Sequence, residues 1–360
     1  MKILRVINSL SIGGAERSVT GNIPLHIKNG YEIDLLLLDG EETFFFRELK
    51  SKKVKIFSLG KKKNILNPFY ILKLIRKMRG YDLVHVSLFP SLYWVALAKI
   101  LSKNDIKLIY TEHATHNRRR NIFVFKYIDE FIYKQYAHII AISPETNKNL
   151  KSHLRGEHKI TTVYNGVDID KIRNDQNSII DDLRSKYQSK KLLVQVASFR
   201  EAKDQDTLIR ALSLLPEYFH VLFVGEGRRM QVCKDLAEQL GVSNRISFLG
   251  LQNNIGAILR ISDIVIMSSH WEGFGRSAIE GMAVGKPVIA SNVVGLANII
   301  RDAGLLFEVG NEINLVNKIL SLSSDEFFYN EIVKKCLIRA EKYSIQKMIE
   351  SYETIYNMFK

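Results

Sequence analysis

The segment HWEGFGRSAIEGMAVGKPVIAS carries two glutamates, Glu272 and Glu280, on either side of a glycine-containing turn. Its pattern predicts a strand end and a loop, followed by a helix over residues 276–283. Both carboxylates can then face one crevice, into which the free backbone N–H groups of Phe274 and Gly275 also point. Such a site suits a ligand with hydroxyls and phosphate together, as in a sugar nucleotide. A helix cap and a solvated helix residue are the alternative explanation.

A second set of polar residues follows another predicted strand, in VASFREAKDQDTLIRAL. Ser198, Arg200 and Lys203 fall in the loop, and Asp204 or Asp206 can cap the next helix. Open parallel sheets bind ligands beyond the carboxyl ends of their strands, where helix N-termini favour phosphate. The loop cations are therefore candidates for a phosphate site, and solvated loop charges are the alternative explanation.

Two glycine-containing corners allow the backbone to approach a ligand closely. Gly13 and Gly14 follow the first predicted strand in NSLSIGGAERSV, and Gly225 follows a later strand in VGEGRRM. An ordinary tight turn also explains a Gly-Gly pair. The second corner lacks the third glycine of the dinucleotide fingerprint, and no acidic residue ends a strand about 20 positions later, which excludes nicotinamide binding.

The elements that must position these residues alternate along the whole chain. Short runs rich in Val and Ile alternate with helix-period stretches, which is typical of parallel sheets covered on both faces. The predicted strands are 2–9, 31–38, 54–59, 82–87, 106–112, 138–143, 191–198, 220–225, 245–250, 263–269, 287–291 and 303–308. We therefore expect an α/β protein with two Rossmann-like domains.

A polar break without a strand pattern separates the two series of strands. We place an N-terminal domain at residues 1–165, a linker at 166–190 and a C-terminal domain at 191–343. An amphipathic helix is predicted for residues 344–360. The 360 residues, 46% of them hydrophobic, suffice to fill two cores.

Several of these motifs together resemble a known family. The pattern from Glu272 to Glu280, continued by GMAVGKPVIAS, resembles the signature of retaining glycosyltransferases of the GT-B fold, family 4, or glycosyl transferases group 1. GGAER, VYNGVD, KDQDTLIRAL, VGEG, RISFLG and IQKMIESYETIY resemble landmarks of this family in the same order. The resemblance implies hexosyltransferase-type activity and two domains facing across a cleft. It also implies that the final helix crosses back onto the N-terminal domain.

The resemblance also implies roles for individual residues. Glu280 would hold the ribose hydroxyls of the donor, and Lys203 would neutralise the leaving diphosphate. Glu272, with the amides of Phe274 and Gly275, would bind hydroxyls of the transferred sugar. The N-terminal domain would be the acceptor domain and the C-terminal domain the donor domain.

The other domain would contribute Gly14, which lies against the diphosphate, and His113, which matches the family's histidine near the sugar. The family usually has an arginine at the position of Ser198, and Arg200 is the candidate to supply that charge from another angle. The implied catalytic side chains are Glu272, His113 and Lys203. The implied donor-binding residues are Gly13, Gly14, Ser198, Arg200, Lys203, Gly225, Phe274, Gly275, Arg276 and Glu280.

The implied reaction uses no metal ion or other cofactor. Fixed cations and oriented N–H groups can stabilise the negative charge that develops on the leaving diphosphate. Two D-x-D triplets, at 168–170 and 204–206, fall in the linker and at a helix start, where caps or solvated acids are expected. The resemblance implies front-side displacement, and the family's common usage points to a UDP-sugar as donor.

The formal charge of +14 lies entirely in the first half, where residues 1–165 hold 28 Lys and Arg against 14 Asp and Glu. This excess suits an anionic partner. We predict a lipid-linked saccharide acceptor, such as a polyprenyl-diphosphate-linked saccharide, at an anionic membrane surface. The residues expected at the acceptor or the membrane are Arg118, Arg119, Arg120, Lys61, Lys62, Lys63, Lys73 and Lys77. A core helix with a solvated basic face is the alternative for residues 68–79.

Other functions are less consistent with the sequence. Nucleic-acid binding would need stacking aromatics on an exposed sheet or a recognition helix, and the buried strands offer neither. A glycosyltransferase with a soluble acceptor and a non-catalytic nucleotide-binding relative remain alternatives to an enzyme of capsule, O-antigen or similar polysaccharide synthesis. Cys233 and Cys336 are unpaired in spacing and no segment suits a membrane span, so we expect a cytoplasmic protein, peripheral at most at the inner face of the membrane.

Overall fold

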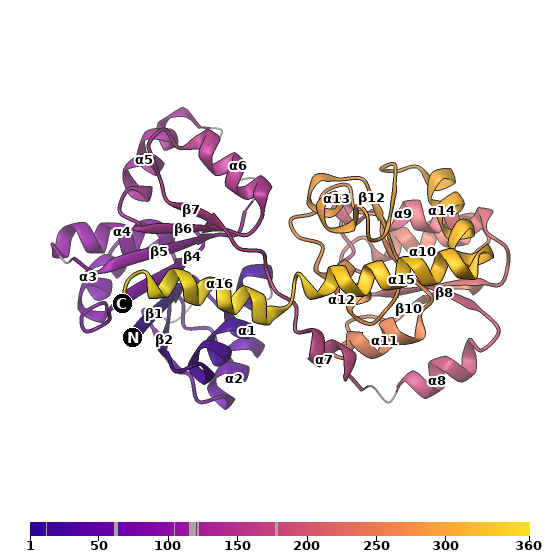
Figure 1. Cartoon of the computed structure of the whole chain (residues 1–360), viewed down its shortest axis with the longest axis horizontal. Coiled ribbons are helices and arrows are strands. Elements are labelled where there is room, and N and C mark those ends of the chain that lie inside the picture. Colours follow the sequence, from indigo (N-terminus) through magenta and orange to yellow (C-terminus); the bar gives the residue numbers. More distant parts are fainter. Residues whose placement is uncertain (12, 61–63, 104, 115–119, 121, 177–178) are drawn as a thin grey trace. The chain divides into compact units, whose positions relative to one another are not determined.

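The computed structural model describes residues 1–11, 13–60, 64–103, 105–114, 120, 122–176 and 179–360 (Figure 1). The chain divides into two compact units. The first unit comprises Met1–Gly166 and Ile345–Lys360, and the second comprises Val167–Ser344. The C-terminal segment thus returns to the first unit, as expected for this fold class.

The first unit contains a seven-stranded parallel sheet with the strand order β3-β2-β1-β4-β5-β6-β7. Its strands are β1 (Lys2–Ile7), β2 (Glu32–Leu37), β3 (Lys55–Ser58), β4 (Leu83–Ser87), β5 (Lys107–Glu112), β6 (His138–Ala141) and β7 (Ile160–Thr162). The central strands are buried along nearly their whole length because helices cover both faces of the sheet, and this explains their continuous apolar sequences.

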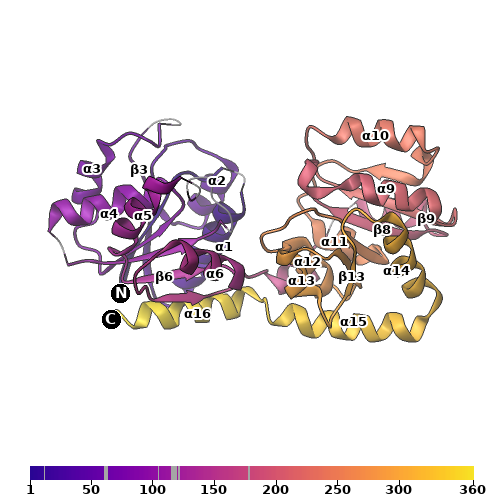
Figure 2. The ribbon, with the colours of Figure 1, turned by 90° about the horizontal axis from the view of Figure 1, so that it is seen from above.

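Two apolar cores lie on the two faces of this sheet. One contains residues of α3 (Tyr70–Lys77), α4 (Ser91–Ser102), α5 (Phe123–Tyr133) and α6 (Pro144–His153). The other contains residues of α1 (Gly14–Lys28), α2 (Phe44–Ser51) and α16 (Ile345–Asn357). Helix α16 lies along the first unit in both views (Figures 1 and 2), so the end of the chain completes the core of its beginning.

The second unit contains a six-stranded parallel sheet with the strand order β10-β9-β8-β11-β12-β13. Its strands are β8 (Lys191–Val196), β9 (Phe219–Val224), β10 (Ile246–Phe248), β11 (Ile264–Met267), β12 (Val288–Ser291) and β13 (Leu305–Phe307). Its helices are α7 (Ile169–Arg173), α8 (Ile179–Lys186), α9 (Gln205–Leu214), α10 (Met230–Gln239), α11 (Ile255–Ile261), α12 (Arg276–Ala283), α13 (Val294–Ile300), α14 (Glu312–Ser324) and α15 (Glu326–Glu341). Short 3-10 turns lie at η2 (Glu201–Lys203) and η3 (Ser243–Arg245).

Each of the twelve predicted strands is present, and so are the two Rossmann-like domains. The sequence did not reveal β7, which has only three residues. The polar stretch predicted as a linker, 166–190, differs more, since it forms α7 and α8 within the second unit. Arg260 donates hydrogen bonds to the carbonyls of Ile172 and Arg173 at 3.0 and 2.7 Å, which fastens the end of α7 to α11.

Cys233 and Cys336 are both buried and free. Burial raises the pKa of each thiol to about 12, so neither forms a thiolate near neutral pH. In the part of the chain that the structure describes, no helix has the length and apolar content needed to span a bilayer.

Candidate functional site

The loop between β11 and α12 is shaped by close backbone approaches. Gly275 caps the N-terminus of α12 with a φ of +62°, and a Cβ there would lie 2.5 Å from Cδ2 of Leu296. A Cβ on Gly295 would lie 1.8 Å from the backbone oxygen of Glu272. These two glycines let the start of α13 press against the loop, which fixes the position of Glu272 ahead of the helix.

The residues around this loop differ in their exposure. Phe274 is buried and packs edge-on against Tyr343, with 5.8 Å between the ring centroids. Glu280 lies one turn into α12, is 3% exposed and accepts a hydrogen bond from Nε of Arg276 at 2.9 Å. A buried carboxylate requires such a partner, and the Arg276 side chain, 33% exposed, keeps part of its guanidinium accessible.

The structure brings Lys203 and Glu272 into direct contact. The Lys203 ammonium forms an ion pair with Oε2 of Glu272, and Oε1 of Glu272 accepts from the amide of Gly273 at 3.2 Å. Both side chains are partly exposed, at 21% and 16%. The ends of β8 and β11 therefore deliver a cation and a carboxylate to one place.

Buried polar contacts hold the backbone beneath Lys203. Its carbonyl accepts hydrogen bonds from Nε2 of Gln195 at 2.8 Å and from Oγ of Ser268 at 3.1 Å. The next residue, Asp204, caps α9 with a side-chain bond from the amide of Thr207 at 3.3 Å. Because these partners come from both strands, the loop after β8 is positioned relative to the loop after β11.

The corner after β9 has a structural function. Gly225 has a φ of +136°, and its amide donates to the carbonyl of Gly250 at 2.8 Å. A Cβ there would lie 2.1 Å from the carbonyl oxygen of Ala197, so the glycine lets the loops after β8 and β9 touch. The carbonyl of Ser198 accepts from Nε2 of Gln205 at 3.2 Å. Arg200 is exposed, and none of the ion pairs among the described residues involves it.

In the first unit, the corner after β1 leads directly into α1. Gly14 is exposed, and a Cβ on it would meet nothing within 4 Å. A Cβ on Gly13 would lie 2.2 Å from Oε2 of Glu16, whose pKa is raised by burial. The N-terminus of α1 is therefore open at Gly14, and the Glu16 carboxyl lies beside Gly13.

His113 follows β5, and the buried cation Arg5 acts on its charge. Its Nε2 is 3.4 Å from Oγ of Ser87, and its buried Nδ1 has no hydrogen-bond partner among the described residues. Burial, and then the positive charge of Arg5, lower the pKa of His113 to about 3, so the ring is neutral at neutral pH. Arg5 is 2% exposed, and its NH1 lies 2.5 Å from Nδ1 of His85 and donates to the hydroxyl of Tyr356 at 2.8 Å.

Arg5 was not identified from the sequence. The available signal was a cation inside the strand KILRVI, where every neighbour is apolar or at the strand start. Such a position is unusual for arginine, because burying a charge is costly unless partners surround it.

The basic residues expected at the acceptor or the membrane have different environments. Lys73 and Lys77 are exposed on α3, but Nζ of Lys73 donates to the carbonyl of Leu59 at 2.9 Å and Nζ of Lys77 lies 3.9 Å from the centroid of the Phe57 ring. The Arg120 side chain is 9% exposed and forms an ion pair with Glu112 at 2.5 Å. Five expected residues lie outside the described part of the chain, namely Lys61, Lys62, Lys63, Arg118 and Arg119.

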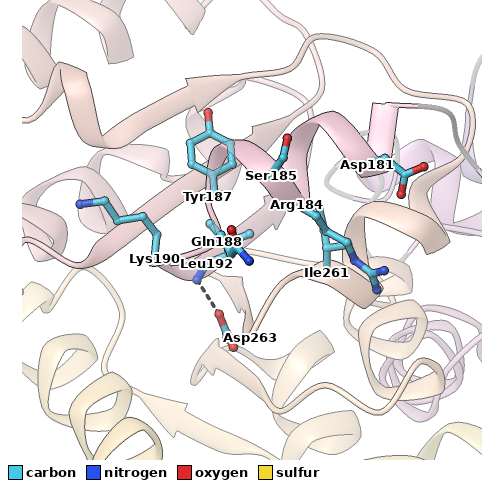
Figure 3. A pocket seen from close by; sticks show the side chains of 9 residues that line it. All are labelled: Asp181, Arg184, Ser185, Tyr187, Gln188, Lys190, Leu192, Ile261 and Asp263. Carbon is cyan, nitrogen blue, oxygen red and sulfur yellow. Dashed lines mark hydrogen bonds between the residues drawn. The ribbon is translucent and has the colours of Figure 1, made fainter.

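A separate hollow of about 570 Å³ in the second unit contains none of the predicted site residues (Figure 3). It lies near the amino ends of β8 and β11, where the amide of Leu192 donates to Oδ2 of Asp263 at 2.6 Å. Lys203 and Glu272 extend from the opposite ends of these strands. Since ligands of open parallel sheets bind at the carboxyl ends, we do not assign the nucleotide to this hollow.

No group of three or more His, Cys, Asp or Glu side chains within the described residues is arranged to hold a metal ion. Asp204 and Asp206, in one of the two D-x-D triplets, have protein partners. Asp204 accepts from Thr207, and Asp206 pairs with Arg229 at 2.6 Å. In the other triplet, Asp168 caps α7 by accepting from the amide of Lys171 at 3.0 Å.

Comparisons with known proteins agree with this architecture. The family model described as Glycosyl transferases group 1 matches residues 178–342, and that described as Glycosyltransferase Family 4 matches residues 12–171. The chain is 25% identical over 359 residues to N-acetyl-alpha-D-glucosaminyl L-malate synthase of Bacillus anthracis, covering 94% of this chain and 87% of that one.

Two further proteins are similar over nearly the whole chain. One is the N-acetylgalactosamine-N,N'-diacetylbacillosaminyl-diphospho-undecaprenol 4-alpha-N-acetylgalactosaminyltransferase of Campylobacter jejuni, 24% identical over 362 residues and covering 95% of each chain. The other is Anabaena HepE, solved in complex with UDP, with a TM-score of 0.87 and 22% identity over 99% of this chain and 100% of that one. At this identity the structural likeness concerns the fold.

Proposed function

This chain belongs to glycosyltransferase family 4, the glycosyl transferases group 1, and we propose that it transfers a sugar from a UDP-sugar to a lipid-linked or growing saccharide. The product would be part of a cell-surface polysaccharide. The observation that carries the proposal is the meeting of Lys203 and Glu272 at two strand ends, ahead of the helix in which Glu280 is buried. Cation, carboxylates and helix N-terminus together match the phosphate and hydroxyls of a sugar nucleotide.

Donor binding would exchange the partners of the Lys203–Glu272 ion pair. The diphosphate, with more negative charge than one carboxylate, would take the Lys203 ammonium, and Arg200 would add a second cation from the same loop. Glu272 would then accept hydrogen bonds from hydroxyls of the sugar. Glu280 would accept from the ribose hydroxyls, with Arg276 holding its carboxylate in place.

The proposed step retains the anomeric configuration. The bond between the anomeric carbon and the diphosphate oxygen breaks, and its electron pair stays on that oxygen. The acceptor hydroxyl oxygen bonds to the same face of the carbon, and its proton passes to the leaving diphosphate. Lys203 and the amides at Phe274 and Gly275 would stabilise charge that grows in the transition state, which is where such groups accelerate a reaction.

We assign His113 a hydrogen-bonding role toward the sugar. Its low pKa keeps it neutral at neutral pH, so it is a poor general acid there. Its Nδ1 is buried and has no hydrogen-bond partner among the described residues, so the hydrogen-bonding capacity of this ring nitrogen is unused in the structure. The ring is oriented by Ser87 on the neighbouring strand.

We further propose that no metal ion takes part, because Lys203, Arg200 and the α12 N-terminus supply the positive charge that a cation would otherwise provide. Transfer should then be unchanged by a chelator. Loss of activity in EDTA that Mg²⁺ or Mn²⁺ restores would contradict this proposal.

The lipid-linked acceptor is supported by the Campylobacter relative, whose name places its substrate on diphospho-undecaprenol, and by the basic first half of the chain. The alternatives are a soluble acceptor and, because Ser198 replaces the family's arginine, a non-catalytic nucleotide-binding relative. Incubation of the protein and UDP-sugars with saccharides on a polyprenyl diphosphate and with the same saccharides free distinguishes the acceptors.

The donor site is tested first by thermal shift with UDP, GDP, ADP and CMP. A nucleotide at 100 times its Kd stabilises the protein by about 2.7 kcal/mol. We expect a shift with UDP that Glu280→Gln abolishes, whereas Glu238→Gln, an exposed glutamate on α10, retains it. No shift with any nucleotide would contradict the donor assignment and favour a non-catalytic relative.

Lys203 is tested by the kinetics of transfer. Lys203→Gln should lower kcat by about 100-fold, because it removes a charge that acts on the leaving group. Lys234→Gln, on the exposed side of α10, is the matched control and should keep the wild-type rate. An unchanged kcat in the Lys203 variant would exclude the proposed role in diphosphate departure.

A further inference from the structure

Helix α5 of the first unit presents a row of large apolar side chains to solvent. Phe123, Val124, Tyr127, Ile128 and Phe131 are between 39% and 69% exposed. They recur at one, four, five and eight positions from the first, so they form one stripe along the helix. We call these five residues the α5 stripe. Such a contiguous exposed apolar surface in a globular protein indicates a binding site for another protein, a membrane or a ligand.

The opposite face of α5 is firmly attached to the first unit. Asp129 is fully buried and receives hydrogen bonds from Nε2 of His153 at 2.8 Å and from the hydroxyl of Tyr93. Ile132 and Tyr133 lie in the apolar core, and the Tyr133 hydroxyl donates to Glu112 at 2.9 Å. Helix α5 thus buries a partnered carboxylate and exposes its apolar stripe. The buried partners fix this orientation, so the stripe cannot turn inward.

Cations border the stripe on the side of α6. The Arg155 guanidinium lies 4.7 Å from the centroid of the Tyr127 ring. Lys134, whose side chain is 59% exposed, follows the C-terminal end of the stripe. Oε2 of Glu130 accepts hydrogen bonds from the amide of Arg155 at 2.9 Å and from Nε2 of His158 at 3.3 Å, and Oε1 forms an ion pair with Lys134 at 3.2 Å. These contacts attach the border to α5.

Arg155 also lines a hollow of about 530 Å³ between α6 and β7. Its other lining residues are Lys151, Leu154, Gly156, Glu157, His158, Lys159 and Ile160. Lys151, Arg155 and Lys159 are exposed, and Glu157 is the acidic side chain among them. The hollow is therefore cationic on balance, and the contact of Arg155 with Tyr127 joins it to the stripe. Figure 1 shows α5 and α6 as neighbours in the first unit.

We propose that the α5 stripe docks on an anionic phospholipid bilayer, with Lys151, Arg155 and Lys159 toward the lipid phosphates. The apolar side chains enter the boundary between headgroups and acyl chains, as those of interfacial helices do. Each cation near an anionic leaflet adds attraction within about a Debye length. Aromatic rings along one helix beside clustered cations complement such a surface in both apolarity and charge.

This surface differs from the one on α3 that the sequence suggested, where Lys73 and Lys77 lie against groups of their own domain. The proposal deepens the lipid-linked acceptor of the proposed function by specifying where the first unit meets the membrane. It does not require donor binding or transfer, so vesicle binding tests it separately.

The experiment is co-sedimentation of the full chain with vesicles of phosphatidylcholine alone and of phosphatidylcholine with 30% phosphatidylglycerol. The double variant Phe123→Ser/Phe131→Ser should bind the anionic vesicles about tenfold or more weakly, because it removes two aromatic side chains that docking would bury in the bilayer. Phe327→Ser/Ile338→Ser, two exposed apolar residues on α15, is the matched control and should bind as wild type. Lys151→Gln/Lys159→Gln should weaken binding to anionic vesicles and flatten its salt dependence.

Three outcomes would overturn the proposal. They are absence of wild-type binding to anionic vesicles at low salt, unchanged binding of the α5 double variant, and loss of binding in Phe69→Ser/Leu72→Ser at α3 instead. A wild-type dimer that the α5 variant converts to a monomer, with vesicle binding retained, would assign the stripe to a second copy of the chain. The thermal shift with UDP is measured on the same preparations. Failure of nucleotide binding with intact vesicle binding would contradict the proposed function and leave the membrane proposal standing.

Discussion

At the residue scale, the environment of His113 keeps its imidazole ring neutral. Burial and Arg5 favour the neutral ring, and the same two causes lower the pKa of His26 to about 3. His85, between Arg5 and Thr111, has a pKa held well below its usual range by burial and by the same arginine. One buried cation in β1 therefore acts on three histidines of the first unit.

This arrangement predicts acid sensitivity. An unfolded histidine takes up a proton below pH 6.5, whereas the folded His113 and His26 stay neutral down to about pH 3. The stabilisation is complete above pH 6.5 and is lost as the pH falls from 6.5 toward 3, by about 1.4 kcal/mol per pH unit for each such histidine.

The measurement is urea unfolding at pH 7.5, 5.5 and 4.5, with His113→Asn as the comparison. In the variant, the free energy of unfolding should depend less steeply on pH, by the contribution of one histidine. An unchanged pH dependence would contradict the low pKa of His113. Arg5→Met should raise the pKa of the three histidines on which Arg5 acts, namely His26, His85 and His113. A histidine NMR titration measures these pKa values.

At the element scale, the turn into α12 depends on a glycine for two reasons. A residue with a Cβ at the left-handed conformation of Gly275 costs about 1–2 kcal/mol, and here the Cβ would also press on Leu296. The same turn presents the Phe274 and Gly275 amides and sets the direction of Glu272. Fold stability and site geometry therefore depend on one backbone position.

We predict that Gly275→Ala destabilises the protein and also weakens UDP binding. Gly310→Ala is the matched control, because its φ is +71° but a Cβ there meets nothing within 4 Å. Both variants should lose stability in urea, and only Gly275→Ala should lose the UDP shift. Equal nucleotide binding by the two variants would show that the turn at Gly275 does not position the nucleotide site.

At the scale of the whole molecule, residues distant in sequence complete one core. Tyr352 and Tyr356 on α16 are buried in the first unit, where Tyr356 accepts from Arg5 and lies 2.6 Å from His85. The last helix thus supplies partners to the cation that controls His113. Loss of this hydroxyl leaves a buried charge with fewer hydrogen bonds.

Tyr356→Phe should destabilise the first unit by about 1–3 kcal/mol, the usual cost when a buried polar group loses its partner. Hydrogen exchange by mass spectrometry should show faster exchange in β1 and β4 and little change in β8 and β11. Tyr329→Phe, which removes a hydroxyl bonded to Asp263 at 2.9 Å in the second unit, should give the reverse pattern. Uniform acceleration in both units would contradict their separate cores.

The sequence alone determined the strands and the candidate residues of the second unit, but not α7 and α8, which lie in the stretch predicted as a linker. Apolar runs identify the strands because burial on both faces leaves few polar positions, and the helix 276–283 follows from its glycine turn. Family motifs led to Glu272, Glu280 and Lys203. Both the apolar runs and the family motifs are short, local patterns of the sequence, so they can be recognised without the tertiary structure.

Tertiary structure alone decided which of these groups meet. The ion pair of Lys203 with Glu272 joins loops 69 positions apart, and the contact of Arg5 with Tyr356 spans 351 positions. The outward direction of the α5 stripe was also undetermined, because the same apolar spacing in a sequence equally predicts a buried face. The buried contacts of Asp129 with His153 and of Tyr133 with Glu112 fix which side of α5 faces solvent, since polar groups with buried partners hold the helix in one orientation.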